Sequence, residues 1–178
     1  CYGYGRNTSP NIDRLSQDGI KFTQAISAGG WTFESVPSIL MGVYPPVYQL
    51  LNADNLLNPE IKTVAEKLNA ADYQCILWSN HVALKLLDIK NGFQKTYIAD
   101  RHKNCKPVLN SHALTTKIIH WLKSRHKKCP FFFYIHYVGC HVPYESPSPY
   151  KYMYMYDKFR GKPEFIPISN LKDKSGQY

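Results

Sequence analysis

Apolar and polar residues follow two different periods along the chain, and the change of period predicts where helices and strands lie. Residues 8–19 have apolar side chains at helical spacing, Pro10 suits the first helical turn, and Gly19 can terminate the helix. Residues 20–26 alternate apolar and polar side chains, which predicts a strand that leads into a pair of glycines at 29–30. The chain therefore opens with a predicted helix followed by a predicted strand.

The alternation of helical and strand patterns continues through most of the chain. Residues 131–138 are apolar at nearly every position, which is typical of a strand buried on both faces of a parallel sheet. We therefore predict an α/β fold with a mostly parallel central sheet and helices on both faces. The remaining predicted elements are a helix at 63–71, a buried strand at 73–79, a short helix at 82–90, an edge strand at 92–98 and the longest helix at 109–126.

The pattern changes after residue 144. We predict a partial α/β domain over residues 1–144 and an extended segment over residues 145–178, which is rich in Pro, Tyr, Lys and Ser and has no periodicity. The first residue is Cys1 rather than methionine, and the chain begins in a turn-like stretch. We therefore expect the sequence to be a piece of a longer protein.

Composition restricts the classes of function. The hydrophobic fraction of 44% and the charged fraction of 20% are typical of a globular protein, and no apolar run is long enough to cross a membrane. The net charge of +9 is spread along the chain. Its densest group, residues 123–128, lies at a predicted helix end, where cations are favourable. We therefore favour a solvated helix end over a nucleic-acid-binding patch, and we expect no nucleic-acid partner.

The five cysteines do not form a recognisable metal or redox motif. No C-x-x-C pair occurs, so the sequence supports neither a zinc ribbon nor a thioredoxin-type site. Cys75 lies in an apolar, strand-like run and is predicted to be a small core residue. Cysteine usage does not indicate the cellular compartment.

Residues 29–45 combine two glycines, hydroxyl side chains and a short apolar run at a predicted helix start. Free N–H groups and the positive end of the helix dipole make such a start an anion site, and a hydroxyl group there can act as a nucleophile on a phosphate or sulfate ester. The hydroxyl of Thr32 or Ser35 can equally serve only as a helix cap. Because Pro37 is tolerated only in the first turn, we predict that the helix begins near Ser35 and that Thr32 lies in the preceding loop.

Three groups of polar side chains come directly after predicted strands. The carboxyl ends of parallel strands meet at one edge of a sheet, where the ligands of α/β proteins bind. A nucleophile and two histidines can therefore face one crevice, although each residue also has a purely structural explanation as a cap, a loop residue or a turn residue. The three groups are Thr32 with Ser35, Asn80 with His81, and His141.

Several segments, in the right order, resemble a known enzyme family. Residues 1–4, 8–15 and 19–25 look like the start of a sulfatase-type domain of the alkaline phosphatase superfamily. Residues 38–45 resemble the end of that family's nucleophile segment, C/S-x-P-S-R-x-x-L-x-T-G-x-Y-P, and residues 131–144 resemble its later strand and P-H-x-P-Y turn. The resemblance covers nearly the whole chain and implies the family's α/β fold in an incomplete form.

The resemblance implies roles for residues by position. Thr32 stands where sulfatases have the Cys or Ser that is oxidised to formylglycine, which threonine cannot yield. Family relatives with threonine at this place are phosphoryl or phosphoglycerol transferases and phosphodiesterases, which use the hydroxyl directly as a metal-activated nucleophile. Glu34 replaces the motif proline, and Val36 replaces the motif arginine. The arginine would help to position an anionic group.

The resemblance also implies the remaining site residues. His141 matches the family histidine that contacts the transferred group, although Cys140 replaces the usual proline. The histidine of another family segment, G-K-W-H, falls one position away from His81. We expect Thr32 and His141 to be catalytic, with Thr32 also a metal ligand, and we expect the substrate to be bound by Ser35, Asn80, His81 and His136.

A divalent cation, Ca or another, is the cofactor that the resemblance implies. The family binds it through an aspartate pair just before the position of Cys1 and through further residues beyond the histidine turn, so those ligands fall outside this sequence. Thr32 alone cannot hold a cation, and we expect the isolated chain to be inactive.

The sequence leads to one main function and two alternatives. The main hypothesis is a fragment of a sulfatase-family hydrolase that in its intact form acts on sulfuric or phosphoric esters through a metal-bound nucleophile. One alternative is a phosphoryl or phosphoglycerol transferase with a threonine nucleophile, and the other is a non-catalytic, anion-binding descendant of the fold. The expected partner is an anionic ester substrate. The resemblance points to the periplasm or the extracellular space, although the sequence itself does not give the compartment.

Overall fold

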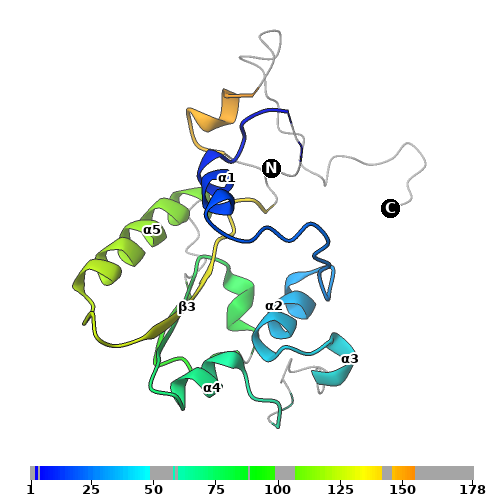
Figure 1. The fold of residues 1–178 in the computed structure, drawn as a ribbon, viewed down its shortest axis with the longest axis vertical. Helices are drawn as coiled ribbons and strands as arrows, with labels where there is room; N and C mark the ends of the chain where they lie inside the picture. The colour runs from blue at the N-terminus through cyan, green and yellow to red at the C-terminus, as the bar shows by residue number, and fades with distance from the viewer. Residues whose placement is uncertain are drawn as a thin grey trace.

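The computed structural model has a three-stranded parallel sheet at its centre (Figure 1). Because β1 pairs in parallel with both of its neighbours, the predicted α/β fold with a parallel sheet is confirmed. The strands are β1 (Gln74–Ser79), β2 (Lys95–Ile98) and β3 (Phe131–His136), in the order β2-β1-β3. The structure describes residues 3, 5–48, 58, 60–87, 89–98, 107–141 and 146–154.

One face of the sheet packs against helices that precede β1 in the sequence. Alternate residues of a strand point to opposite faces, so Cys75 and Leu77 share a face. Both side chains are fully buried, in one hydrophobic cluster with Val36 of α2 (Thr32–Met41) and with residues of α4 (Val64–Asn69). The predicted place of Cys75 in the core is confirmed.

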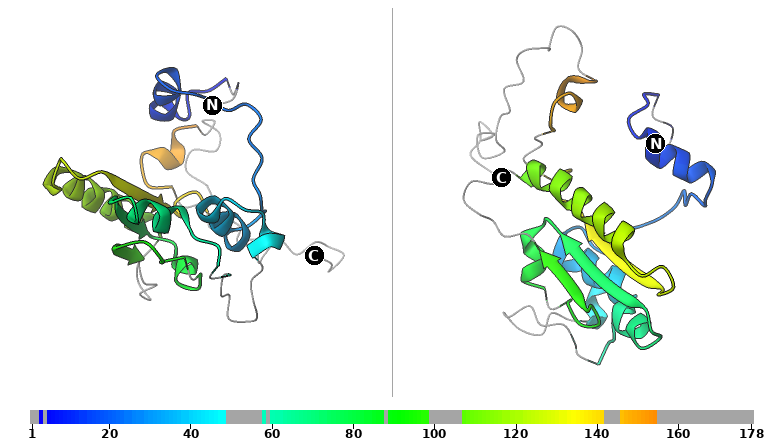
Figure 2. Two further views of the ribbon diagram at one scale, coloured as in Figure 1. Left: turned by 60° about the horizontal axis from the view of Figure 1, so that its bottom comes forward. Right: turned by 90° about the vertical axis from the view of Figure 1, so that its left-hand side faces the viewer.

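The other face of the sheet packs against α5 (Pro107–Ser124). Trp121 of this helix is buried, and its ring centre lies 5.4 Å from that of Phe131 and 5.2 Å from that of Phe133. Figure 2 shows α5 on one side of the strands and α2 on the other. Helices thus cover both faces of the sheet, as the sequence predicts.

β3 is an edge strand, and it is less buried than its sequence predicts. Residues 131–134 are half-buried, and Ile135 is 37% exposed. The prediction of a strand buried on both faces is therefore wrong for this structure. The physical reason is that, in the part of the chain that the structure describes, no strand pairs with the outer edge of β3.

The helix α2 begins earlier than its proline predicts. Trp31 is the N-cap residue and Thr32 is the first helical residue, so Pro37 lies inside the helix. The prediction of a start near Ser35 is wrong. Pro37 costs the helix one backbone hydrogen bond, but Pro37 and its neighbour Val36 are both buried in the core, and this burial offsets the cost.

The other helix boundaries follow ordinary sequence signals. Gly42 ends α2 with a φ of 71°, which favours glycine, and α3 (Pro45–Tyr48) comes next. At the start of α4, the Thr63 side chain accepts a hydrogen bond from the Glu66 N–H at 3.1 Å, and the Glu66 carboxylate accepts one from the Thr63 N–H at 2.8 Å. This reciprocal pair is a capping box. The 3₁₀ helix η1 (Val82–Lys85) then follows β1.

The N-terminal part of the chain lies away from the sheet, as both views of Figure 2 show. α1 (Pro10–Gln17) confirms the first predicted helix, but residues 20–26 form no strand. These residues are exposed, and Ile26 is 94% exposed. The strand prediction is wrong because an alternating segment needs a neighbouring strand to pair its backbone groups, and the described sheet places none beside it.

A short segment late in the chain contacts the N-terminal part. Residues 146–154 contain the 3₁₀ helix η2 (Tyr150–Tyr152). Arg6 Nη1 donates a hydrogen bond to the carbonyl oxygen of Tyr154 at 2.8 Å, and the Tyr154 hydroxyl donates one to the carbonyl oxygen of Asn7. Segments near the two ends of the described chain are thus held together.

The predicted division into residues 1–144 and 145–178 stays a prediction, because most of the second segment lies outside the described residues. None of the helices that the structure describes combines the length and hydropathy needed to cross a bilayer.

Candidate functional site

The hydroxyl groups that we expect at an anion site lie in the first turn of α2. Thr32 is half-buried and is the first residue of the helix. Its N–H group is one of those in the first helical turn that have no hydrogen-bond acceptor within the helix. Ser35 donates from both its Oγ and its N–H to the carbonyl oxygen of Trp31, at 2.9 Å each. Neither side chain caps the helix, so the interpretation of these residues as N-caps is wrong.

Glu34 brings a carboxylate to the same helix start. Its Oε2 accepts a hydrogen bond from the Gly30 N–H at 3.1 Å. A Cβ atom on Gly29 would lie 2.3 Å from the Glu34 Cβ, so this close approach requires glycine at position 29. The negative charge of Glu34 is favourable at the positive end of the helix dipole. It therefore competes with an external anion for the same place.

The side chain of residue 36, where the family motif has arginine, points into the core of the protein. Val36 stands at this position, is 2% exposed and packs in the cluster that contains Leu77. Its side chain therefore makes no contact with an anion at the helix start. A cationic group for such an anion has to come from another part of the protein.

Three histidines come together at the carboxyl ends of β1 and β3. His81 follows β1, His136 is the last residue of β3, and His141 lies in the turn after β3. The ring centre of His81 lies 5.3 Å from that of His136 and 5.6 Å from that of His141. His81 and His136 lie 60 and 5 residues before His141 in the sequence. The fold brings all three together because β1 and β3 are parallel and end at the same edge of the sheet.

Burial affects the protonation of His136, one member of this histidine cluster. Burial, with a smaller contribution from the charge of His81, lowers the pKa of His136. The Tyr134 hydroxyl lies 3.1 Å from His136 Nδ1, and burial raises the pKa of Tyr134 to about 12. At neutral pH a neutral phenol therefore contacts a neutral imidazole, which can accept a proton but adds no positive charge.

Asn80 holds the turn that carries His141. The Asn80 side chain is 7% exposed, and its Oδ1 accepts a hydrogen bond from the Val138 N–H at 2.8 Å. Its Nδ2 donates to Ser111 Oγ on α5 at 2.9 Å. The turn is closed by the His141 N–H, which donates to the Val138 carbonyl at 2.8 Å. Asn80 is thus a positioning residue, and its expected contact with substrate stays a prediction.

Sequence reasoning missed two residues of this region. Tyr134 lies two positions before His136, so the alternation of side chains along a strand is a signal that places both on one face. Ser111 is 31 residues from Asn80 in sequence. Nothing in the local sequence indicates that these two side chains meet.

Thr32 is not hydrogen-bonded to the histidine cluster. The helix that it begins packs in one hydrophobic cluster with Tyr134 of β3, on the face of the sheet to which Tyr134 points. Among the described residues, no hydrogen bond links Thr32 to His81, His136 or His141. The structure thus places the two parts of the expected site on one face of the sheet without joining them.

A hollow of about 520 Å³ lies along α2 beside Ser35. Helical spacing puts Thr32, Ser35 and Ile39 on one side of the helix. Ile39 is exposed and lines the hollow together with Ile26 and Tyr44, which are also exposed. Because this lining is mainly apolar, the hollow suits the organic part of an ester rather than its anionic group.

The described residues do not fit the divalent cation that the resemblance implies. They contain no group of three or more His, Cys, Asp or Glu side chains arranged to hold a metal ion. Thr32 offers only a neutral hydroxyl, whereas Ca²⁺ and Mg²⁺ are held mainly by carboxylate, carbonyl and water oxygens. The carboxylate ligands of such a cation would have to come from other residues.

A family model described as Sulfatase matches residues 1–164. Arylsulfatase H of Homo sapiens is 38% identical over 56 residues, which are 32% of this chain and 10% of that protein. Steryl-sulfatase of Mus musculus is 31% identical over 88 residues, covering 43% of this chain and 14% of that protein. The chain thus spans only a small part of the curated relatives that it matches.

A solved structure shares the fold. The phosphonate monoester hydrolase of Agrobacterium radiobacter matches with a TM-score of 0.70 and 17% sequence identity, covering 86% of this chain and 40% of that one. The arrangement of strands and helices described above is therefore that of an alkaline-phosphatase-like α/β fold.

Proposed function

We propose, from the premise that the chain belongs to the sulfatase family, that the whole protein hydrolyses sulfuric or phosphoric esters and that these residues supply its nucleophile segment. The observation that carries the proposal is the position of Thr32. It is the first residue of α2, inside the matched region, at a helix start where backbone N–H groups favour an anion.

Thr32 acts in this proposal by covalent catalysis. Its Oγ1 attacks the S or P atom of the ester, a bond forms between them, and the bond from that atom to the leaving alcohol breaks. The hydroxyl proton passes to a neighbouring base, and His141 donates a proton to the leaving oxygen. Water then attacks the same atom, sulfate or phosphate leaves, and Thr32 regains its proton.

The histidine cluster supports these proton transfers. His141 is exposed, so a substrate can reach it, and its ring lies 5.6 Å from that of His81. His81 in turn lies beside His136, whose pKa burial lowers. Imidazole side chains can both donate and accept a proton, which suits them to general acid and base catalysis.

The hollow beside Ser35 supports an ester with an apolar organic part. It begins one helical turn beyond Thr32 on the same side of α2. An anionic group at Thr32 would therefore place an aryl or alkyl group near Ile39. Apolar contacts of this kind add affinity in proportion to the area that they bury.

We expect the whole protein to bind the divalent cation that the family uses. When bound, such a cation increases the nucleophilicity of a hydroxyl and neutralises charge on the transferred group. The described residues do not provide its ligands. We therefore expect residues 1–178 alone to be inactive.

A transferase is a second candidate, and the identity of residue 32 favours it. Threonine in place of a formylglycine precursor suits direct attack on a phosphorus ester. An acceptor alcohol would then replace water in the second step. Comparing turnover of bis-p-nitrophenyl phosphate with that of p-nitrophenyl sulfate, with and without added glycerol, separates this function from sulfate ester hydrolysis.

A non-catalytic descendant is a third candidate, and two side chains at α2 favour it. Glu34 places a carboxylate at the helix start, and Val36 buries the position where the motif has arginine. Both changes weaken binding of an anionic ester. An anion that binds without turnover in the whole protein, with divalent cation present, would support this candidate over the enzyme.

The first experiment is an assay of the 178-residue chain with p-nitrophenyl sulfate and bis-p-nitrophenyl phosphate in the presence of Ca²⁺, Mg²⁺, Mn²⁺ or Zn²⁺. We expect no turnover with either substrate. Clear turnover that is lost on Thr32→Ala would contradict the expectation of inactivity and would assign the nucleophile directly.

A further inference from the structure

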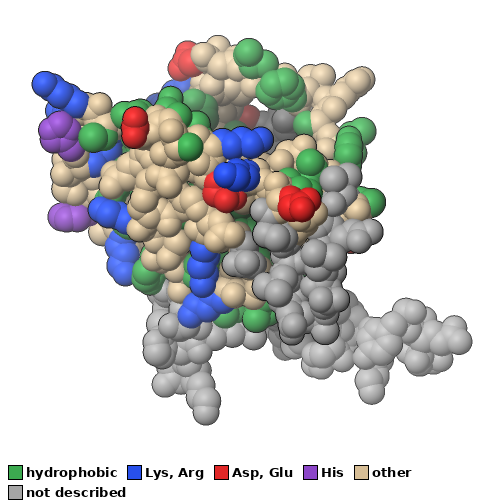
Figure 3. Space-filling model, turned by 90° about the horizontal axis from the view of Figure 1, so that it is seen from below, with side chains coloured by type: hydrophobic (Ala, Val, Ile, Leu, Met, Phe, Trp, Pro, Cys, Tyr) green, Lys and Arg blue, Asp and Glu red, His purple; other side chains and the backbone are tan. Residues whose placement is uncertain are grey.

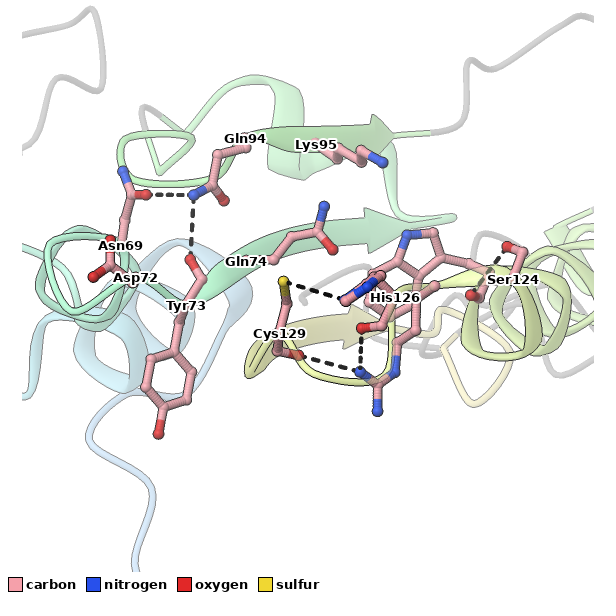
Figure 4. A pocket seen from close by; sticks show the side chains of 11 residues that line it. Asn69, Asp72, Tyr73, Gln74, Gln94, Lys95, Ser124, His126 and Cys129 are labelled. Atoms are coloured by element: carbon pink, nitrogen blue, oxygen red, sulfur yellow. Dashed lines mark hydrogen bonds between the residues drawn. The ribbon is translucent and has the colours of Figure 1, made fainter.

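A second cavity lies at the opposite end of the sheet from the histidines. It has a volume of about 550 Å³ and is formed where β1 and β2 begin and where α5 ends (Figure 4). Cavities of this size bind small molecules. Most of the side chains that line it are polar, including Asn69, Gln74, Gln94, Lys95, Arg125 and His126.

Hydrogen bonds hold one wall of the cavity in place. Gln94 Oε1 accepts from the Cys75 N–H at 2.6 Å, and Gln94 Nε2 donates to the Tyr73 carbonyl at 3.2 Å. Gln94 Nε2 also donates to the Asn69 side chain. These contacts join α4, β1 and the start of β2, so this wall is fixed before any ligand binds.

Arg125 holds the opposite wall. Its Nη1 donates to the Cys129 carbonyl at 3.2 Å and to the His126 carbonyl at 3.4 Å. The guanidinium carbon lies 4.3 Å from the centre of the Phe131 ring, which is a cation–π contact. The basic group at residues 123–128 is thus partly built into the structure rather than being only a solvated helix end.

Positive charge predominates around the cavity. Lys95 and Arg125 both line it, and among the lining residues that the structure describes Asp72 is the only carboxylate. Lys127 and Lys128 follow directly in the sequence, and the chain as a whole carries a net charge of +9. Figure 3, which shows the molecule from below, has basic side chains spread over that face and histidines at one edge. This charge distribution favours an anionic ligand.

The neutral lining groups favour a ligand with hydroxyl groups. The side-chain amide of Gln74 lines the cavity and can donate and accept hydrogen bonds. The Ser124 hydroxyl also lines it; because it donates to the Trp121 carbonyl oxygen at 3.2 Å, it offers a ligand an acceptor. Trp121 adds part of a buried aromatic surface. Polar groups set at several points around one cavity fix the orientation of a ligand more than they raise its affinity.

We propose that this cavity binds a small anionic polyol, of the size and chemistry of a sugar phosphate or sugar sulfate. Lys95 contacts the anionic group, and the amide and hydroxyl side chains contact the hydroxyl groups of the ligand. The site is separate from the α2 start, so it does not depend on the function proposed for Thr32.

Cys129 provides a reporter of occupancy. Its Sγ lies 3.9 Å from His126 Nδ1, and the residue is exposed and lines the cavity. Cys140 is also exposed, but it lies after β3 near the histidine cluster. A ligand in the cavity should therefore slow alkylation of Cys129 while leaving the rate at Cys140 unchanged.

The experiment measures the rate of iodoacetamide alkylation at Cys129 and Cys140 by peptide mass spectrometry, in the 178-residue chain. The probes are glucose 6-phosphate, glucose 6-sulfate, glucose and inorganic phosphate at equal concentrations and ionic strength. We expect each anionic sugar to slow Cys129 alkylation about fivefold or more at saturation, and glucose or phosphate alone to protect far less.

Lys95→Ala should weaken the protection by a sugar phosphate about tenfold, as expected for the loss of one charged hydrogen bond. Lys95→Arg should retain it. The matched control is Lys67→Ala, which removes a lysine of α4 that is also exposed and is not among the residues that line the cavity.

Three results would each overturn the proposal. One is unchanged alkylation of Cys129 at millimolar concentrations of both anionic sugars. Another is equal protection of Cys129 and Cys140. The third is equal protection by inorganic phosphate and by the sugar phosphate, which would mean a simple anion site without recognition of hydroxyl groups.

Discussion

Thr32 and Glu34 give the start of α2 opposite tendencies. An anion bound at Thr32 would meet the backbone N–H groups of the first helical turn. The Glu34 carboxylate, however, already lies there and accepts a hydrogen bond from the Gly30 N–H. Which tendency prevails depends on the charge of one side chain. The electrostatic effect of a charge at a helix terminus is about 0.3–1 kcal/mol when the site is exposed.

Glu34→Gln should therefore strengthen sulfate binding at this site about two- to fivefold, because it removes the competing charge and keeps a hydrogen-bond acceptor. Trp31 is the N-cap residue of the helix and is 59% exposed, so sulfate titration followed by tryptophan fluorescence reports on the site. The control is Glu60→Gln, which changes the same charge on an exposed residue elsewhere. Equal effects of the two substitutions would contradict a role for Glu34.

Burial of His136 should make the stability of the chain depend on pH. Because the pKa of His136 is lower in the folded state than its ordinary value near 6.5, the unfolded state binds more protons in this pH range. The free energy of unfolding therefore falls as pH decreases from about 7 to 5. Urea denaturation at several pH values should show a shallower fall for His136→Gln than for the unchanged chain.

The exposed His112 provides the control for this measurement. His112→Gln should leave the pH dependence of stability unchanged. His81 and Tyr134 adjoin His136, and His141 adjoins His81; none of these three residues is altered in the comparison. A pH dependence that is identical in the unchanged chain and in His136→Gln would show that burial of His136 does not affect stability.

Sequence reasoning reached the histidines but not the side chains that position them. The rule that parallel strands bring their carboxyl ends together identified His81 and His141. The fold-back of Glu34 onto Gly30 and the contact between Asn80 and Ser111 depend on the packed structure. Such contacts leave no periodic signal in the chain.

At the scale of elements, α2 shows how packing overrides local preference. Pro37 predicts a helix start near Ser35, but the helix begins at Thr32 because Val36 and Leu40 are buried against the sheet. Burial of a large apolar side chain contributes about 1.5–3 kcal/mol, so two such residues offset the cost of an interior proline. Position 32 is part of the helix for this reason.

Leu40→Ala should lower the free energy of unfolding by about 2–5 kcal/mol, because Leu40 is 1% exposed in the core. The matched control is its neighbour Ile39, which is 64% exposed. Ile39→Ala should change stability by less than about 0.5 kcal/mol. Urea denaturation of both variants measures this difference, and a loss of similar size in each would show that α2 is not docked as described.

The strands β1 and β3 and the helix α5 could be predicted because their own residues carry the signal. An apolar run of strand length and a long helical stripe are each sufficient. Residues 20–26 carry a strand pattern as well, but a strand also needs a partner for its backbone groups. The sequence of the segment does not indicate whether a pairing strand is present, and in the described sheet no strand lies beside it.

At the scale of the whole molecule, the chain carries a recognisable part of a larger fold. It belongs to the sulfatase family and shares 86% of its length with the fold of a phosphonate monoester hydrolase, but only 40% of that structure is covered. The described residues contain the segment that we propose to carry the nucleophile, together with His141, but no group of three or more side chains that could hold a metal ion. Activity is therefore a property that we propose for the whole protein.

The most direct test is the effect of Thr32→Ala on kcat/KM for p-nitrophenyl sulfate and bis-p-nitrophenyl phosphate, measured in the whole protein with divalent cation present. The control is Thr116→Ala, because Thr116 is an exposed threonine on α5 whose Oγ1 bonds only a backbone carbonyl of its own helix. Loss of the nucleophile should reduce kcat/KM about a thousandfold or more for the preferred ester, and the control should retain full activity. Undiminished turnover by Thr32→Ala would contradict the account.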